Sequence, residues 1–273
     1  MARTRVRITP LLALSFSTAL LLTATGCGGE SDTSSSSSDA DAAGKGTGPV
    51  VVATTSWEGA FAKAAGAEDV TVIVPESVQH APDYDPKPSD LAAVADADFV
   101  LYAPFEPYAE KFKEAAGGDA ELVEVNLDND ADKAKAEVTR LGKMFGTEDT
   151  AAEWITSFDT EYGKLQKDLK SAWPDGKAPT VVAQVFSAWS AKLARAEVVG
   201  TYGPEAVTAK QLSDLSKKKP RLVLDNVHMT TGTVLPDSGA RQVGIVNYPD
   251  KDLDLLTVYK NAATTLEKAM NAS

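Results

Sequence analysis

The sequence is poor in the residues that most site chemistry needs. Its 273 residues include one cysteine and two histidines, and aromatic side chains make up only 7%. A single cysteine excludes an internal disulfide and a multi-thiolate zinc site, and two histidines supply at most two imidazole ligands. Basic residues number 27 against 39 acidic ones, which gives a net charge of −12. Because so acidic a chain cannot bind nucleic acid by neutralising phosphates, we expect no nucleic-acid partner.

Motifs of the common enzyme classes are also missing. The chain contains no G-x-S-x-G elbow, no Walker loop and no H-E-x-x-H pair. The glycine-rich run from Gly200 to Gly203 is not followed by the Lys and Ser/Thr that a phosphate-binding loop requires. We therefore expect a binding protein rather than an enzyme.

The first 26 residues are predicted to be a lipoprotein signal peptide. Arg3, Arg5 and Arg7 precede two short apolar runs, and the stretch ends in the small residues before Cys27. The apolar runs are too short and too interrupted for a permanent transmembrane helix. The position of Cys27 resembles the lipobox of bacterial lipoproteins, in which the cysteine carries the lipid. An ordinary signal peptide with an incidental cysteine is the alternative.

Residues 27–48 are predicted to be a flexible tether. They are rich in Ser, Gly and Asp and contain no large apolar side chain, a composition that does not build a packed core. Removal of residues 1–26 takes away three arginines and no acid, so the mature chain carries a charge of −15. We expect a domain held at the extracellular face of the cell membrane by the lipid on Cys27.

From residue 49 onward, short β-branched runs alternate with helical segments. Such alternation favours βα units, right-handed crossovers and parallel sheets. The predicted strands are 50–54, 70–74, 99–102, 122–125, 180–183, 198–202, 222–224 and 243–246.

One long segment interrupts this alternation. Apolar residues from Ala151 to Trp173 recur every three or four positions, which predicts a helix, and Thr150 with Glu153 has the spacing of a capping box at its start. We predict one connecting helix at 148–173.

The fold class is therefore expected to be α/β. Two βα lobes with mainly parallel sheets, at 49–147 and 174–273, are joined by the long rigid helix. Ligands of open parallel sheets bind outside the carboxyl ends of the strands. A cleft between two facing lobes is the expected ligand site, and we expect the protein to be a monomer.

Both histidines follow predicted strands, one in each lobe. His80 and His228 could therefore face one cleft, and Glu106 follows the strand that ends at Tyr102. Two imidazoles and a carboxylate suit a divalent ion of the zinc or manganese class. The alternative is that each is an ordinary loop residue. Trp189 either stacks on an organic ligand or packs in the core. The further cleft candidates are Asp83, Asp85, Asp225, Asn247 and Trp189.

The segment from Tyr84 to Leu91, followed by Ala95-Asp96-Ala97-Asp98 and a strand, carries a family resemblance. It is similar to the zinc/manganese-type (cluster A-I) solute-binding lipoproteins of bacterial ABC importers, as is the opening run from Val51 to Ser56. The match is strongest over residues 50–112. The resemblance implies two lobes joined by a rigid helix, one divalent ion as cargo between them, and an ABC permease as partner.

The positions at which this family places its metal ligands differ here. Aligned on Tyr84, the first family histidine falls at Pro82, and His80 lies two residues earlier. The late aspartate of the family falls near Asn247. The other two family segments are replaced by Asn126-Leu127-Asp128-Asn129 and by the run from Gln184 to Trp189.

These departures leave two interpretations of the cleft. Either His80, Glu106 and His228 form a metal site at new positions, or the cleft binds a non-metal or chelated small ligand. A surface interaction protein with a vestigial cleft is a third hypothesis from a different class. The leading expectation is a lipid-anchored receptor that captures a zinc- or manganese-class ion, without a catalytic cofactor, and delivers it to an ABC permease.

Overall fold

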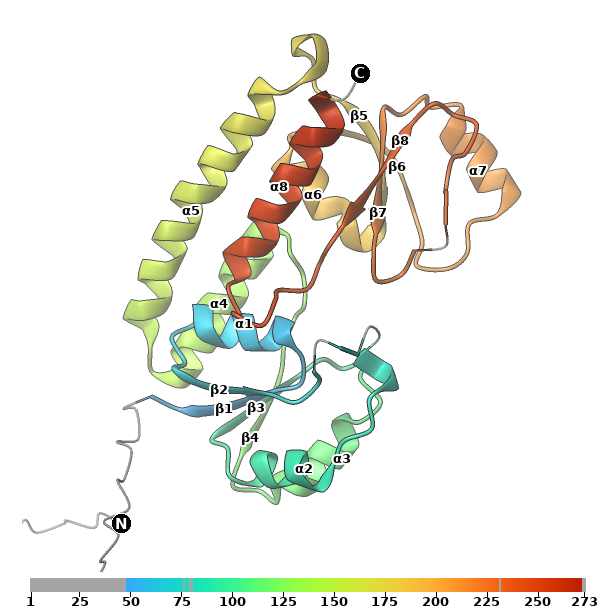
Figure 1. Cartoon of the computed structure of the whole chain (residues 1–273). Coiled ribbons are helices and arrows are strands. Elements are labelled where there is room, and N and C mark those ends of the chain that lie inside the picture. The colour runs from blue at the N-terminus through green and yellow to red at the C-terminus, as the bar shows by residue number, and fades with distance from the viewer. Residues whose placement is uncertain (1–47, 76, 79–80, 231, 272–273) are drawn as a thin grey trace, which may run out of the picture. The chain divides into compact units, whose positions relative to one another are not determined.

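The structure is a computed structural model that describes residues 48–271, apart from residues 76, 79–80 and 231 (Figure 1). The predictions for the signal peptide, for Cys27, for nearly all of the tether and for His80 lie outside the described residues. No helix in the described part combines the length and the apolar character that crossing a membrane requires.

The N-terminal lobe is a four-stranded parallel sheet in the order β2-β1-β3-β4. Its first helix begins at a capping box in which Thr55 and Glu58 satisfy each other's backbone amides. Pro88 opens the second helix in the first turn, where its missing N–H has no partner to lose. The elements are β1 (Val50–Ala53), α1 (Ser56–Ala64), β2 (Asp69–Val72), the short 3₁₀ turn η1 (Ala81–Asp83), α2 (Pro88–Ala95), β3 (Phe99–Tyr102), α3 (Ala109–Ala116) and β4 (Glu121–Glu124).

Two helices follow this sheet, where the sequence predicted one. The unexpected helix is α4 (Ala131–Phe145), which Asp130 caps at its start and Gly146, with a left-handed backbone, ends. The connecting helix is α5 (Glu148–Ser171). It begins two residues before the predicted capping box because the turn at Gly146 leaves Thr147 as the N-cap residue.

The C-terminal lobe repeats the parallel topology in the order β6-β5-β7-β8. Thr208 and Gln211 form a capping box at the start of α7. The short helix α6 was not expected. The elements are η2 (Pro174–Gly176), β5 (Thr180–Gln184), η3 (Val185–Ser187), α6 (Ala188–Leu193), β6 (Glu197–Tyr202), α7 (Ala209–Ser216), β7 (Leu222–Asn226), β8 (Arg241–Ile245) and α8 (Leu255–Asn271).

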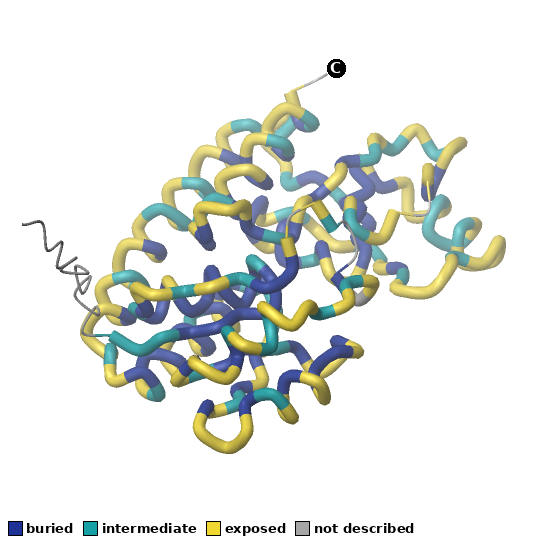
Figure 2. The backbone as a smooth tube through the Cα atoms, turned by 60° about the horizontal axis from the view of Figure 1, so that its bottom comes forward, coloured by how far each residue is buried: buried dark blue, intermediate teal, exposed yellow. Residues whose placement is uncertain are grey.

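The faces of the two sheets pack differently, as the alternation of side chains along a strand requires. Val51 and Val181 point into one large cluster, which we call the shared core because it contains residues of both lobes. Their neighbours Val52 and Val182 point the other way, into two smaller outer clusters, one in each lobe. Figure 2 shows the resulting pattern, with dark blue strands inside and helices that are buried along one side.

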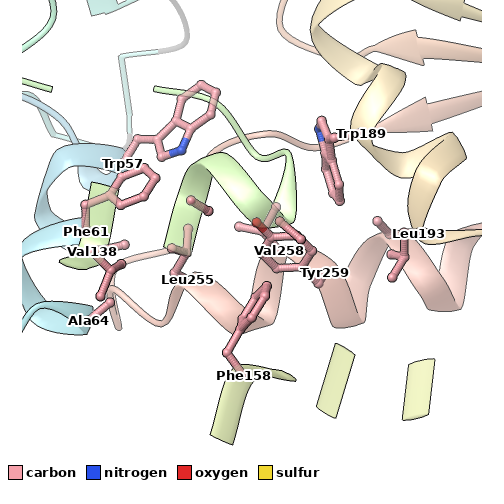
Figure 3. Packing of buried hydrophobic residues seen from close by; sticks show 14 of the residues in the cluster. Trp57, Phe61, Ala64, Val138, Phe158, Trp189, Leu193, Leu255, Val258 and Tyr259 are labelled. Carbon is pink, nitrogen blue, oxygen red and sulfur yellow. The ribbon is translucent and has the colours of Figure 1, made fainter. Parts of the chain in front are cut away.

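The helices α1, α4, α5 and α8 complete the shared core. α5 and α8 run side by side, and α1 and α4 also contact this layer (Figure 1). Tyr259 on α8 is fully buried at the centre, with its ring edge-on to Phe158 and Trp189 (Figure 3). Because residues of both lobes pack on the same helices, the lobes are held by one continuous apolar interior.

Candidate cleft between the lobes

A cavity of about 750 Å³ is lined by residues of both lobes. The N-terminal lobe contributes residues that follow β1 and β2, and the C-terminal lobe contributes residues that follow β7 and β8. This is the position in which open parallel sheets bind ligands, since loops at the carboxyl ends of strands share one edge. The lining residues are Thr55, Ser56, Val72, Val74, Pro75, Val78, Ala81, Val227, His228, Val246, Tyr248, Pro249, Asp250, Lys251, Leu253 and Asn261.

His228 is the imidazole of this cavity. It lies two residues beyond β7, where its backbone N–H donates to the Oδ1 of Asn226 at 3.0 Å. Its ring lies edge-on to Tyr248, with 4.7 Å between centroids, and its buried Nε2 has no hydrogen-bond partner among the described residues. Burial lowers the pKa of His228, so the ring is neutral at pH 7 and offers a lone pair.

Glu106 lies at the cleft edge of the N-terminal lobe but faces inward. Its two carboxyl oxygens accept from the backbone N–H of Ala103 at 3.0 Å and from the hydroxyl of Tyr108 at 3.2 Å. Glu58, which is fully buried, accepts from the hydroxyl and the backbone N–H of Thr55, and its Oε1 has no partner. The strand ends of β1 and β3 thus bring two carboxyl groups together in the interior.

Burial raises the affinity of both carboxyl groups for protons. Burial raises the pKa of Glu106 to about 8, and the charge of Glu58 adds to the rise. Burial likewise raises the pKa of Glu58, against hydrogen bonds that lower it. Burial raises the pKa of Tyr248 to about 12, with the charges of Glu58 and Glu106 adding to it. Tyr248 thus lies near the charges of the carboxyl pair, and its ring also contacts His228.

The other acidic candidates make structural contacts. Asp225 is buried and accepts from the side chains of Tyr202, Thr230 and Gln242 at 2.6 to 3.0 Å. Asp85 is exposed and pairs with Lys111 at 2.7 Å. Asp83 is exposed at the end of η1. None of the three aspartates lines the cavity.

Trp189 and Asn247 lie in the interior, and neither lines the cavity. The indole N–H of Trp189 donates to the Oδ1 of Asn247 at 2.9 Å. The side-chain amide of Asn129 donates to the carbonyl of Asn247 at 2.9 Å, and its own oxygen accepts from the indole of Trp57 at 3.1 Å. Trp189 is thus a core residue, and Asn247 ties the two lobes together. In Figure 3 both tryptophans lie on the same side of α8, with Trp57 toward α1 and Trp189 toward α6.

The predicted metal ligands are not gathered into one group within the described part of the chain. No cluster of three or more His, Cys, Asp or Glu side chains that could hold a metal ion is present among the described residues. Glu106 has both oxygens engaged, and no carboxylate shifts the pKa of His228. The set formed by His80, Glu106 and His228 stays a prediction because His80 is not described.

Two residues of this region were missed by the sequence reasoning. Glu58 was hidden because Thr55-x-x-Glu58 has the ordinary spacing of a capping box, which does not reveal that the carboxyl is buried. Tyr248 follows β8 by three residues and carried no motif. Its place after a predicted strand was the one available signal.

Comparison with known families identifies the scaffold. The model of the family described as zinc-uptake complex component A, periplasmic (ZnuA) matches residues 51–193, just over half of the chain. The chain belongs to the ZnuA family. This family comprises metal-binding solute-binding proteins of ABC zinc and manganese uptake, which are transport proteins and not enzymes. None of the curated proteins matches the sequence.

Solved structures share the fold of this ZnuA-family chain at low sequence identity. The SBP FpvC from Pseudomonas aeruginosa, in complex with Mn²⁺, is 14% identical with a TM-score of 0.60, over 81% of this chain and 97% of that one. The laminin-binding protein Lmb of Streptococcus agalactiae, described as an adhesin with metal transporting activity, is 17% identical with a TM-score of 0.57, over 82% and 98%. AdcAII of Streptococcus pneumoniae is 18% identical with a TM-score of 0.56, over 81% and 98%.

Proposed function

We propose that this protein is a lipid-anchored receptor that captures a divalent metal in the cleft between its lobes and delivers it to an ABC permease. The observation that carries the proposal is the unpartnered Nε2 of His228 in a cavity at the carboxyl ends of the strands of both lobes. A neutral imidazole is a ligand for zinc and related ions. Membership of the ZnuA family supports the same cargo class.

The proposed ligand set starts from His228 and includes His80 and Glu106. His80 belongs to the segment between Val78 and Ala81, both of which line the cavity. Glu106 lies beneath the cleft edge, and its carboxyl has to leave Ala103 or Tyr108 to reach an ion. His228 is therefore the residue on which capture depends most, and Glu106 the one on which it depends least.

Membrane attachment through Cys27 is the second part of the proposal. The single cysteine follows a basic and apolar leader, and a Ser- and Gly-rich tether separates it from the folded lobes. Such an arrangement keeps the receptor, as a monomer, near a permease in the same membrane. Cys27→Ser should release the protein into the medium, and retention of that variant in the membrane fraction would contradict lipid anchoring.

Thermal melting of the mature chain tests metal capture. After chelator treatment, Zn²⁺, Mn²⁺, Fe²⁺, Co²⁺, Ni²⁺ and Cu²⁺ are added singly, and an ion that binds only the folded state stabilises it by about 4 kcal/mol at a thousandfold excess over Kd. One or two ions should raise the melting temperature, and His228→Ala should remove most of the rise.

The matched control for the His228 variant is Asn261→Ala, which changes another polar residue of the cavity wall. It should keep the response to metal. An unchanged melting temperature with every ion, in the wild-type chain, would reject the capture of free metal.

A further inference from the structure

The walls of the cavity are more apolar than a site for a bare ion requires. Aliphatic side chains of the N-terminal lobe face aliphatic side chains of the C-terminal lobe, with Tyr248 beside them. The volume of about 750 Å³ lies within the range of small-molecule sites. A zinc ion, held about 2 Å from its ligands, would occupy a small part of it. The aliphatic lining residues are Val72, Val74, Val78, Val227, Val246 and Leu253.

Exposed apolar side chains also gather at the strand ends. Among the described residues, seven large hydrophobic side chains are exposed, and six of them lie within three residues after the carboxyl ends of β3, β5, β7 and β8. Single exposed apolar residues need no explanation, but their concentration on one class of loop marks a surface that binds something apolar. The six are Phe105, Val185, Phe186, Val227, Met229 and Val246.

The polar groups of the cavity do not complete a coordination sphere. The described lining contains one imidazole, His228, and one carboxylate, Asp250, whose Oδ1 already accepts from the backbone N–H of Asp252 at 3.1 Å. A closed zinc site takes four ligands. Lys251 lines the same wall, is exposed, and has no ion-pair partner among the described residues. The wall therefore presents a lone pair, a free cation and apolar surface together.

We propose that the cargo enters this cleft as a metal chelate, a divalent ion already held by a small anionic organic molecule. The apolar walls contact the organic frame, Lys251 pairs with an anionic group, and the Nε2 of His228 binds the metal at its open coordination position. One water leaves the ion as the imidazole nitrogen binds, and no proton or electron is transferred. This inference rests on the proposed receptor function and names the form of its cargo.

Isothermal titration of the mature chain tests the proposal. The probes are Zn²⁺ alone, three chelators alone (8-hydroxyquinoline-5-sulfonate, citrate and nitrilotriacetate), and the three one-to-one zinc complexes. At least one complex should bind tenfold or more tighter than both Zn²⁺ alone and its own chelator. His228→Ala should weaken that complex at least tenfold.

A variant of Lys251 tests the proposal even if the His228 variant does not fold. Lys251→Gln changes an exposed side chain and should weaken the same complex about threefold to tenfold, with a loss that shrinks at high salt. Lys260→Gln removes an equally exposed charge from α8 outside the cavity and should change nothing.

The remaining outcomes separate this inference from the receptor function. Zinc alone binding as tightly as every complex would overturn the chelate proposal and leave the receptor function standing. A chelator binding as tightly without zinc as with it would overturn the recognition of metal altogether. Failure of zinc and of all three complexes to bind would overturn both proposals.

Discussion

The two lobes have the same topology and differ in what they add to it. In both lobes the first strand in sequence pairs on one side with the second and on the other with the third, and all pairs are parallel. The outer cluster of the N-terminal lobe holds eleven buried residues under α2 and α3, whereas that of the C-terminal lobe holds five. The two lobes thus share one core on one face of each sheet, and they differ in the size of the apolar cluster on the other face.

The cleft edges of the lobes differ in chemistry as well. The N-terminal edge buries the carboxyl pair Glu58 and Glu106, and the C-terminal edge presents His228 and Tyr248 to the cavity. A buried carboxyl pair costs stability when it ionises, while a neutral imidazole with a free nitrogen is ready to bind. At the cleft, the N-terminal lobe therefore carries the carboxyl groups with raised pKa, Glu58 and Glu106, and the C-terminal lobe carries the imidazole nitrogen of His228 that could bind a ligand.

Loss of an aromatic ring from the shared core should lower the free energy of unfolding most, because residues of both lobes pack in that core. Tyr259→Ala removes a fully buried ring and the hydrogen bond from its hydroxyl to the carbonyl of Asn129. We expect a loss of about 4 kcal/mol in the free energy of unfolding, in one transition, by urea denaturation. The exposed neighbour, Lys260→Ala, should cost less than about 0.5 kcal/mol. Two separate transitions would contradict a core that the lobes share.

The pH dependence should come from the N-terminal edge. Because the folded pKa of Glu106 is raised from 4.5 to about 8, the folded state holds a proton that the unfolded state has lost. The contribution of Glu106 to stability is therefore fully present below about pH 4.5 and is lost as pH rises toward 8, by about 1.4 kcal/mol per unit of pKa shift. Glu106→Gln should flatten the profile of urea midpoints against pH, whereas the exposed Glu114→Gln should not. A slope unchanged by Glu106→Gln would assign the proton to another group, such as Glu58.

Valine-to-alanine substitutions at equivalent positions of the two sheets measure how much each outer cluster contributes to stability. Val100 on β3 and Val223 on β7 lie beside Val52 and Val182 in matching registers, and both are buried. Valine to alanine should cost roughly 2–3 kcal/mol at Val100 and roughly 1–2 kcal/mol at Val223, where fewer buried neighbours surround it. Chemical denaturation measures both, and equal costs would mean that cluster size does not govern them.

The smallest effect should come from the surface link between the lobes. Lys192 on α6 pairs with Asp130 at 2.9 Å and with Asp132 at 2.8 Å, at the start of α4. Its side chain is half exposed, so Lys192→Met should cost less than about 1 kcal/mol. The loss should vanish in 1 M salt, where charges are screened within a few ångströms. A loss that persists in salt would point to packing of the stem.

Much of the fold could be predicted because it depends on near neighbours. All eight strands overlap the short apolar runs that predicted them. α4 was missed although its buried residues, Ala134, Val138 and Leu141 among them, recur every three or four positions. α5 starts at the predicted residue, Glu148, but the capping box predicted from Thr150 and Glu153 was wrong because Thr147 is the N-cap residue.

The candidate site could be predicted less well. Residues after strand ends were the right place to search, and His228 was found that way. The contacts of these residues could not be predicted, because the sequence does not show which of many possible partners each acidic or amide side chain meets in the fold. Asp225 accepts hydrogen bonds from Tyr202, Thr230 and Gln242, and no spacing in the sequence predicts these contacts.

The sequence by itself determined the alternation of strands and helices, the caps that start several of the helices, and the family to which the chain belongs. These follow from periodicity and from contacts a few residues apart. Only the tertiary structure decided that Glu106 lies beside Glu58, that His228 meets Tyr248, and that Asn129 bonds to the carbonyl of Asn247, 118 residues away. Such pairs depend on how two lobes close over common helices, and that packing is a property of the whole chain.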